Sequence, residues 1–131
     1  MSKIRGFTMI EVLLVAIIIA VLVSIAVPNY IQATERARAR EAISTLNAMI
    51  AAERTYNAER RIYLDLTTAA GDVNWAAVGM DNPNENAQRS FDYVFSEASA
   101  TATATRLGPV NIGDTITLDD AGNLDVSGWS P

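Results

Sequence analysis

Gly6-Phe7-Thr8-Met9-Ile10-Glu11, followed by the sixteen uncharged residues 12–27 and then by Pro28, is the stretch that decides the fold. Between Phe7 and Val27 the only ionisable side chain is that of Glu11. About 20 apolar residues in a helix are enough to cross the hydrocarbon core of a bilayer. The sequence therefore predicts a membrane-spanning helix that carries one carboxylate near its start.

The flanks of this stretch predict its orientation. Lys3 and Arg5 precede it, and cytoplasmic flanks of membrane helices carry an excess of basic residues. The N-terminus is therefore predicted to stay inside and the rest of the chain outside. A secretory signal peptide is the alternative, because Ser24-Ile25-Ala26 has the small-x-small spacing of a cleavage site. Spacing alone leaves both interpretations open.

Glu11 argues against a signal peptide. An isolated carboxylate in a lipid-embedded helix costs roughly 2 to 4 kcal/mol, so it needs a partner. Residues 7–27 contain no lysine, arginine or histidine that could pair with it. Either Glu11 lies close enough to the headgroups to stay hydrated, or its partner comes from another molecule or from a chain terminus made by cleavage.

These residues resemble the N-terminus of type IV pilins and of the related pseudopilins of type II secretion. The resemblance covers about the first sixty residues and rests on a short basic leader, Gly6, Phe7, Glu11 and the proline inside the helix. It implies that residues 1–6 are a leader, that prepilin peptidase cuts between Gly6 and Phe7, and that the new amine of Phe7 is methylated. It also implies that Glu11 attracts the amino group of Phe7, in its own chain or a neighbour's, during filament assembly.

The same resemblance implies a fold and a set of partners. The fold would be α+β, with one long N-terminal helix packed against a small antiparallel sheet of about four strands. The partners would be other copies in a helical filament, the prepilin peptidase, an inner-membrane assembly platform and, before assembly, membrane lipid. The precursor would lie in the inner membrane and the product in an extracellular filament. Two departures are Met9, where the family usually has leucine, and the lack of the cysteine pair of many Gram-negative pilins.

Pro28 lies inside the predicted helix. Its ring removes the hydrogen-bond donor that the Ser24 carbonyl would otherwise have. We therefore expect a bent, continuous helix with a kink or a locally melted turn between Ser24 and Pro28, which would let a filament stretch. The alternative is that Pro28 begins a new helix, since proline is well suited to a first helical position.

The helix is predicted to have a hydrophobic half, residues 7–30, and an amphipathic half, residues 31–61. No glycine or proline interrupts residues 29–61, and about fifty helical residues would extend roughly 75 Å. Three arginines past the membrane boundary, Arg36, Arg38 and Arg40, are interpreted as a solvated collar in preference to salt bridges with acidic neighbours in a filament. The face predicted to pack on the head comprises Ala42, Ile43, Leu46, Met49, Ile50, Glu53 and Tyr56.

The remaining chain is predicted to form the globular head. Residues 62–90 are expected to be a connecting loop, and residues 91–131 an antiparallel sheet. Alternation places three aromatics on one face of the first strand, and the next strands are expected at residues 100–107, 115–118 and 123–127. The aromatics are Phe91, Tyr93 and Phe95, and the anchors expected in the loop are Val73, Trp75, Val78 and Met80.

The acidic turn at residues 119–125 allows a second interpretation. Asp119, Asp120, Asn123 and Asp125 are spaced closely enough to suggest a calcium loop. No glutamate closes a twelve-residue loop, however, and Asp and Gly are the residues that a hairpin turn requires. A hairpin turn is favoured, and we predict neither a metal nor a cofactor.

Composition disfavours several other functions. The chain has no histidine and no cysteine, which removes the commonest acid–base and nucleophilic groups, so no catalytic residue is predicted. Residues 63–131 contain two arginines and ten acids, a balance that repels nucleic acid. Aromatics are 7% of residues, and core packing explains them better than an electron path along a filament.

Three functional hypotheses result. The first is a structural subunit, a major pilin, of a type IV pilus that serves adhesion, motility or uptake. The second is a pseudopilin of a type II secretion system. The third is a permanently membrane-anchored binding domain, whose mark would be an uncut bond between Gly6 and Phe7.

Overall fold

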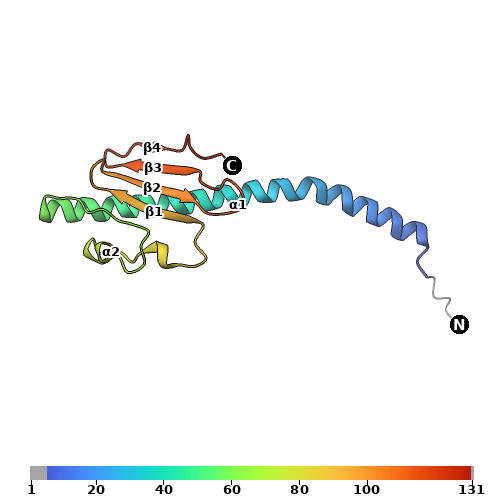
Figure 1. Cartoon of the computed structure of the whole chain (residues 1–131). Coiled ribbons are helices and arrows are strands. Elements are labelled where there is room, and N and C mark those ends of the chain that lie inside the picture. Colours follow the sequence, from blue (N-terminus) through green and yellow to red (C-terminus); the bar gives the residue numbers. More distant parts are fainter. Residues whose placement is uncertain (1–5, 131) are drawn as a thin grey trace. The chain divides into compact units, whose positions relative to one another are not determined.

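The computed structural model describes residues 6–130 and has an α+β architecture (Figure 1). One long helix precedes a four-stranded sheet, as predicted. The predicted leader lies outside the described residues except for Gly6. The elements are the helices α1 (Met9–Arg60) and α2 (Val73–Ala77), the 3-10 helix η1 (Pro83–Glu85), and the strands β1 (Phe91–Ser96), β2 (Thr101–Arg106), β3 (Thr115–Asp119) and β4 (Leu124–Asp125).

The chain divides into two compact units, which we call the N-terminal unit (Met1–Glu35) and the head (Arg36–Pro131). Helix α1 contributes to both. In the N-terminal unit it is continuous through Pro28, so this proline does not begin a new helix. The residues between Ser24 and Pro28 are helical, and the kink or melting of this turn stays a prediction. By length and composition α1 is able to cross a membrane, and none of its most apolar stretch is buried.

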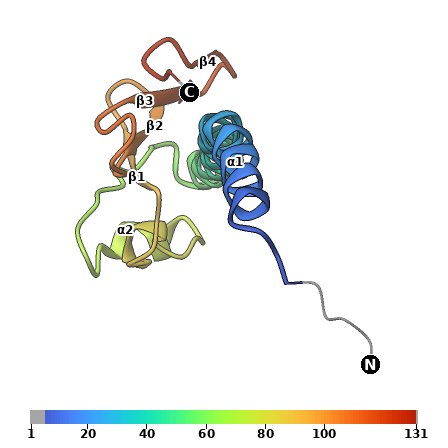
Figure 2. The same cartoon turned by 90° about the vertical axis from the view of Figure 1, so that its right-hand side faces the viewer.

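In the head, the second half of α1 packs against one face of the sheet (Figures 1 and 2). The strands are antiparallel and lie in the order β1-β2-β3-β4. The predicted helix face is confirmed, because Ala42, Leu46, Met49, Ile50 and Glu53 are buried. The sheet contributes the predicted aromatics of β1 together with Ala102, Ala104, Ile116 and Leu118.

Alternation along the strands explains how the helix and sheet fit together. In β2 the sequence Thr-Ala-Thr-Ala-Thr-Arg places the even-numbered residues inside and the threonines on the outer face. Ala102 and Ala104 are fully buried, and their small side chains let α1 approach the middle of the sheet closely. The aromatic side chains that the sheet contributes to the core come from the flanking strand β1 and are Phe91, Tyr93 and Phe95.

The predicted loop, residues 62–90, contains the two short helices α2 and η1. Trp75 is the anchor that was expected: it is 1% exposed, and its indole N–H donates to the Thr67 carbonyl over 2.9 Å. Val78 and Met80 are partly buried against the core. The prediction for Val73 is wrong, because this residue is 76% exposed. It is the first residue of α2, and the buried side of that single turn is taken by Trp75.

The outer edge of β1 is protected by side chains and a short bridge. Leu66 forms an antiparallel bridge with Phe95. The buried Asn84 amide replaces a further strand: Tyr93 N–H donates to Asn84 Oδ1, and Asn84 Nδ2 donates to the Tyr93 carbonyl, both over 2.8 Å. These contacts occupy backbone groups that an unprotected edge would offer to another chain.

The last strand is shorter than predicted. Residues 123–127 were expected, and β4 comprises only Leu124–Asp125. The Asp125 carboxylate accepts the Ser127 N–H over 2.8 Å. Such a local side-chain bond competes with a sheet ladder and ends the strand.

Candidate functional site

The start of α1 is organised around Thr8 and Glu11. Thr8 donates to Glu11 Oε2 twice, from its backbone N–H over 2.9 Å and from its hydroxyl over 2.8 Å. The Glu11 N–H in turn donates to Thr8 Oγ1 over 3.3 Å. Since α1 begins at Met9, Thr8 is the N-cap and Glu11 the third helical residue, which is the reciprocal arrangement of a capping box.

This capping box gives Glu11 a role within its own chain that our sequence analysis missed. The signal was present as a threonine three residues before the glutamate. The first N–H groups of a helix have no intrahelical partner, and lipid cannot supply one. Glu11 and Thr8 therefore satisfy donors that would otherwise be left unpaired at the start of this apolar helix.

One oxygen of Glu11 stays available. Oε2 receives both Thr8 bonds, and Oε1 has no hydrogen-bond partner among residues 6–130. Phe7 is 85% exposed, and it lines an open, mostly apolar hollow of about 320 Å³ together with Glu11, Val12 and Val15. The structure thus brings the two predicted assembly residues, Phe7 and Glu11, to one surface. Chemically, Oε1 of Glu11 can accept a hydrogen bond from an ammonium group and pair with its charge.

Ser24 and Pro28 are separate from this surface. Ser24 lies thirteen residues after Glu11 in the helix, or roughly 20 Å along the axis. The Ser24 hydroxyl donates to the Val21 carbonyl over 2.7 Å. The proposed role of these two residues in stretching is therefore independent of the capping box.

The acidic turn of the head engages protein donors. Asp119 accepts Asn123 N–H and Nδ2–H over 2.7 and 2.8 Å, and these bonds hold the pKa of Asp119 below its ordinary value. Asp120 accepts Arg54 Nε–H over 2.7 Å and the Tyr63 hydroxyl over 2.8 Å, which lowers the pKa of Asp120. Hydrogen bonds from Ser127 similarly lower the pKa of Asp125.

These carboxylates point to different partners and do not converge on one position. Among residues 6–130 no group of three or more acidic side chains is arranged to hold a metal ion. The arrangement is that of a hairpin turn. Asp120 also joins the turn to α1 through Arg54, and through Tyr63 it joins the turn to residues 62–90, which we call the connection. The sequence did not predict these contacts, because the partners are 66 and 57 residues apart.

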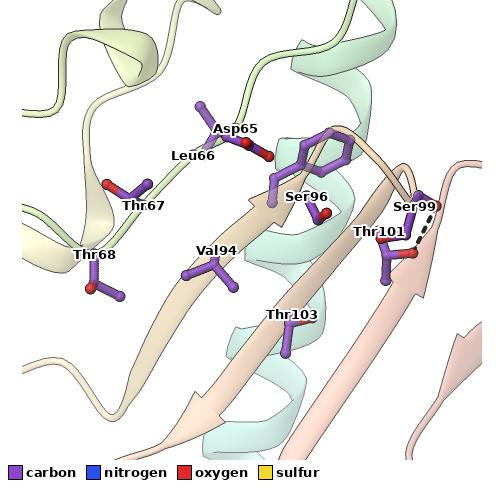
Figure 3. A pocket seen from close by; sticks show the side chains of 10 residues that line it. Asp65, Leu66, Thr67, Thr68, Val94, Ser96, Ser99, Thr101 and Thr103 are labelled. Carbon is purple, nitrogen blue, oxygen red and sulfur yellow. Dashed lines mark hydrogen bonds between the residues drawn. The ribbon is translucent and has the colours of Figure 1, made fainter.

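A groove of about 400 Å³ lies on the head where the connection meets the outer face of β1 and β2 (Figure 3). Its lining is mostly hydroxyl-bearing, and Asp65 is the single charged residue in it. The Thr101 hydroxyl donates to the Ser99 carbonyl over 3.0 Å, and Asp65 Oδ1 accepts the Glu97 N–H over 2.8 Å. These groups serve the adjoining turn, and the groove lacks the paired acid and base that general acid–base catalysis needs.

The arginine collar is partly solvated. Arg36 and Arg40 are exposed, whereas Arg38 is half-buried. Two ion pairs of the head join Arg54 to Asp120 and Arg89 to Asp92.

Comparison with known proteins finds two similarities, and the first of them includes the residues of the capping box. A family model described as the prokaryotic N-terminal methylation motif matches residues 1–27. The chain is also 37% identical over 67 residues to the type IV major pilin protein PilA of Myxococcus xanthus (strain DK1622). That alignment covers 51% of this chain and 30% of the relative. The motif, this similarity and the long helix whose second half packs on a four-stranded antiparallel sheet support a type IV pilin family for this chain.

Proposed function

We propose that the chain is a major pilin, the structural subunit of a type IV pilus filament that serves adhesion, motility or uptake. Prepilin peptidase would cut it between Gly6 and Phe7 and methylate Phe7, and the product would polymerise through α1. The single observation that carries this proposal is the exposure of the apolar side chains along the first half of α1, among them Leu14, Ile18 and Leu22.

Such a surface requires a cover from outside the chain. Contiguous apolar patches larger than a few hundred Å² are rare on monomeric soluble proteins and mark protein or membrane contacts. The residues of the hydrophobic core all belong to the head, and none of them covers the first half of α1. Lipid would cover the helix first, with the N-terminus inside and the head outside. Other copies would then cover it in the filament, after delivery by an inner-membrane assembly platform.

Glu11 would set the register of that packing. A carboxylate in lipid is costly unless paired, and the two Thr8 donors offset part of that cost through Oε2. The remaining oxygen can receive the methylated ammonium of Phe7 from its own chain or from a neighbour. An incoming copy whose ammonium is out of register would leave both charges unpaired in a low-dielectric environment.

The alternative of a type II secretion pseudopilin shares the N-terminal motif. The similarity to a protein named as a major pilin favours the pilus subunit. A permanently anchored binding domain is the third hypothesis, and the same experiment separates all three.

The experiment is an intact-mass measurement on material sheared from the cell surface. A mass that lacks residues 1–6 and carries one added methyl group is expected for the pilin. Processed protein found only in the membrane fraction would favour the pseudopilin. An unprocessed mass would contradict the filament proposal and support the permanent anchor.

A pair of variants tests the role of Glu11 directly. Glu11→Gln keeps an acceptor for Thr8 but removes the charge, so we expect processed protein in the membrane and its loss from the sheared fraction. Glu59→Gln is the matched control, because Glu59 is an exposed glutamate of the same helix. Normal amounts of Glu11→Gln in sheared filaments would show that the charge is not required for assembly.

A further inference from the structure

The head contains one buried carboxyl group that the assembly site does not use. Glu53 lies on the buried face of α1 and is 0% exposed. Its Oε2 accepts the Leu64 N–H over 3.1 Å. Its Oε1 is buried and has no hydrogen-bond partner among the described residues. An unpaired charge in this position would be strongly disfavoured, whereas a neutral carboxyl costs much less to bury.

Among the charges of the described residues that shift the pKa of Glu53, none is a cation. Asp65 and Tyr63 face it from the connection, and both interact unfavourably with a negative charge there. Arg54 is the next residue of α1, but its guanidinium binds Asp120 in the β3–β4 turn. Burial, and then the negative charge of Asp65, raise the pKa of the Glu53 carboxyl, while the Leu64 N–H bond only partly opposes them.

We propose that Glu53 is a proton-linked clasp: its carboxyl stays neutral to a higher pH in the folded head than in the unfolded chain, binds the connection to α1 through Leu64, and weakens that attachment when it ionises. The inference concerns the head alone and does not rest on the proposed filament function. In the neutral form the proton is on Oε1, and Oε2 is the carbonyl oxygen that accepts from Leu64.

The clasp holds a segment that protects the sheet. Leu66 and Phe95 exchange two backbone hydrogen bonds, of 3.0 and 2.9 Å, along the outer edge of β1. Asp65 binds the Glu97 N–H, and Tyr63 binds Asp120. Ionisation of Glu53 would strain this segment where it leaves α1. Detachment of the segment around Leu66 would uncover the edge of β1 and make strand pairing with other chains easier.

The sign of the pH dependence follows from the direction of each shift. Below 4.5, the ordinary value for a glutamate, Glu53 is protonated in both the folded and the unfolded chain, and its contribution to stability is complete. As the pH rises through the higher pKa of the folded state, that contribution is lost. Asp120 acts oppositely, because its pKa is lowered: its contribution is present above 3.8 and is lost as the pH falls through the pKa of the folded state.

The contribution of Tyr63 to stability is lost in a different pH range from that of Glu53. A hydrogen bond to Asp120 raises the pKa of Tyr63, so its own contribution is lost only as the pH rises above 10.0. Between the acidic range in which Asp120 loses its contribution and the alkaline range in which Tyr63 does, the stability of the head should therefore decline as the pH rises.

The test is urea unfolding of the full chain in detergent micelles, followed by tryptophan fluorescence from pH 4.5 to about 9, the upper end of the range in which buried glutamates titrate. Trp75, which is buried beside Thr67 of the connection, and Trp129, which is partly buried against the core, both report unfolding of the head. The urea midpoint of the wild type is expected to fall across this range. Glu53→Gln should abolish the decline, while Glu41→Gln, at an exposed position of the same helix, should keep it.

A wild-type midpoint that does not fall, or a Glu53→Gln variant that keeps the wild-type decline, would overturn the proposal. A second measurement avoids dependence on the folding of the variant. In the wild type, NMR of ¹³C-labelled glutamate carboxyl groups should show one signal, assigned to Glu53, that titrates well above the others. Titration of all glutamates near their ordinary value would equally overturn the clasp.

Discussion

Two leucines of α1 have opposite surroundings in the two units of the molecule. Leu22 in the N-terminal unit is 61% exposed, and Leu46 in the head is 0% exposed. Both are in the same continuous helix. Helical structure therefore does not by itself bury an apolar face. The head supplies its own cover from the sheet and the connection, whereas the apolar side chains of the described part of the N-terminal unit remain exposed.

The largest effect should come from a cavity in the head. Leu46→Ala is expected to destabilise the head by about 2 to 5 kcal/mol, because a fully buried leucine loses both transfer energy and packing. Leu22→Ala removes the same atoms from the exposed half and should leave head unfolding unchanged. Urea unfolding in micelles, followed by tryptophan fluorescence, measures both. Equal losses for the two variants would show that the units are not energetically distinct.

A charge placed in the N-terminal unit tests whether the exposed apolar half of α1 contacts lipid. Lysine at the centre of a membrane helix costs about 2.5 to 3.5 kcal/mol on insertion scales. Ile18→Lys should therefore deplete the protein from the membrane fraction, while Ser44→Lys, on the exposed face of α1 in the head, should not. Fractionation and immunoblotting provide the measurement. Normal membrane retention of Ile18→Lys would exclude a lipid-facing role for this helix half.

Removing the side chain that protects the edge of β1 should lower the free energy of unfolding by a smaller amount. Asn84→Ala removes both side-chain bonds to the Tyr93 backbone and leaves buried polar groups unpaired. A loss of about 1 to 3 kcal/mol in unfolding free energy is expected. Gln88→Ala is the control, since Gln88 is exposed and its contact is made through the backbone. If Asn84→Ala unfolds at the control midpoint, the amide does not stabilise the edge.

The capping box should have the smallest effect. Thr8→Ala is expected to cost about 1 kcal/mol of helix stability, and Thr8→Ser should preserve most of it. Amide hydrogen exchange at Glu11 in micelles reports the change, because its N–H donates to the Thr8 hydroxyl. Faster exchange in both variants, or in neither, would contradict the capping role.

Local patterns predicted much of the fold. The alternation of Phe91, Tyr93 and Phe95 placed β1 and its buried face correctly, and helical spacing identified Leu46 and its neighbours as core. The prediction for Val73 failed because the sequence contains no information on which side of a single turn faces the core. Asn84 could not be predicted as a surrogate strand, since its partner lies nine residues away across a loop.

The candidate sites likewise include features that the sequence predicted and features that it did not. Phe7 and Glu11 were predicted from a short motif, and the structure brings them to one hollow. The reciprocal bonding of Thr8 and Glu11 was predictable from spacing but was missed. The environment of Glu53 was not predictable, because the amphipathic pattern marked it as a core position without showing whether a cation would accompany it. Its partner Leu64 and its neighbour Asp65 come from a connection whose course depends on Trp75 and Leu66.

The sequence by itself determined the apolar helix start, its single carboxylate and the alternating strands, because these depend on residues a few positions apart whose periodicity decides which side chains share a face. Only the tertiary structure decided that Arg54 binds Asp120, that Asn84 closes the edge of β1 and that Glu53 has one unpaired oxygen. Those contacts join residues far apart in the chain, and their energies depend on burial that arises only when helix, connection and sheet pack together.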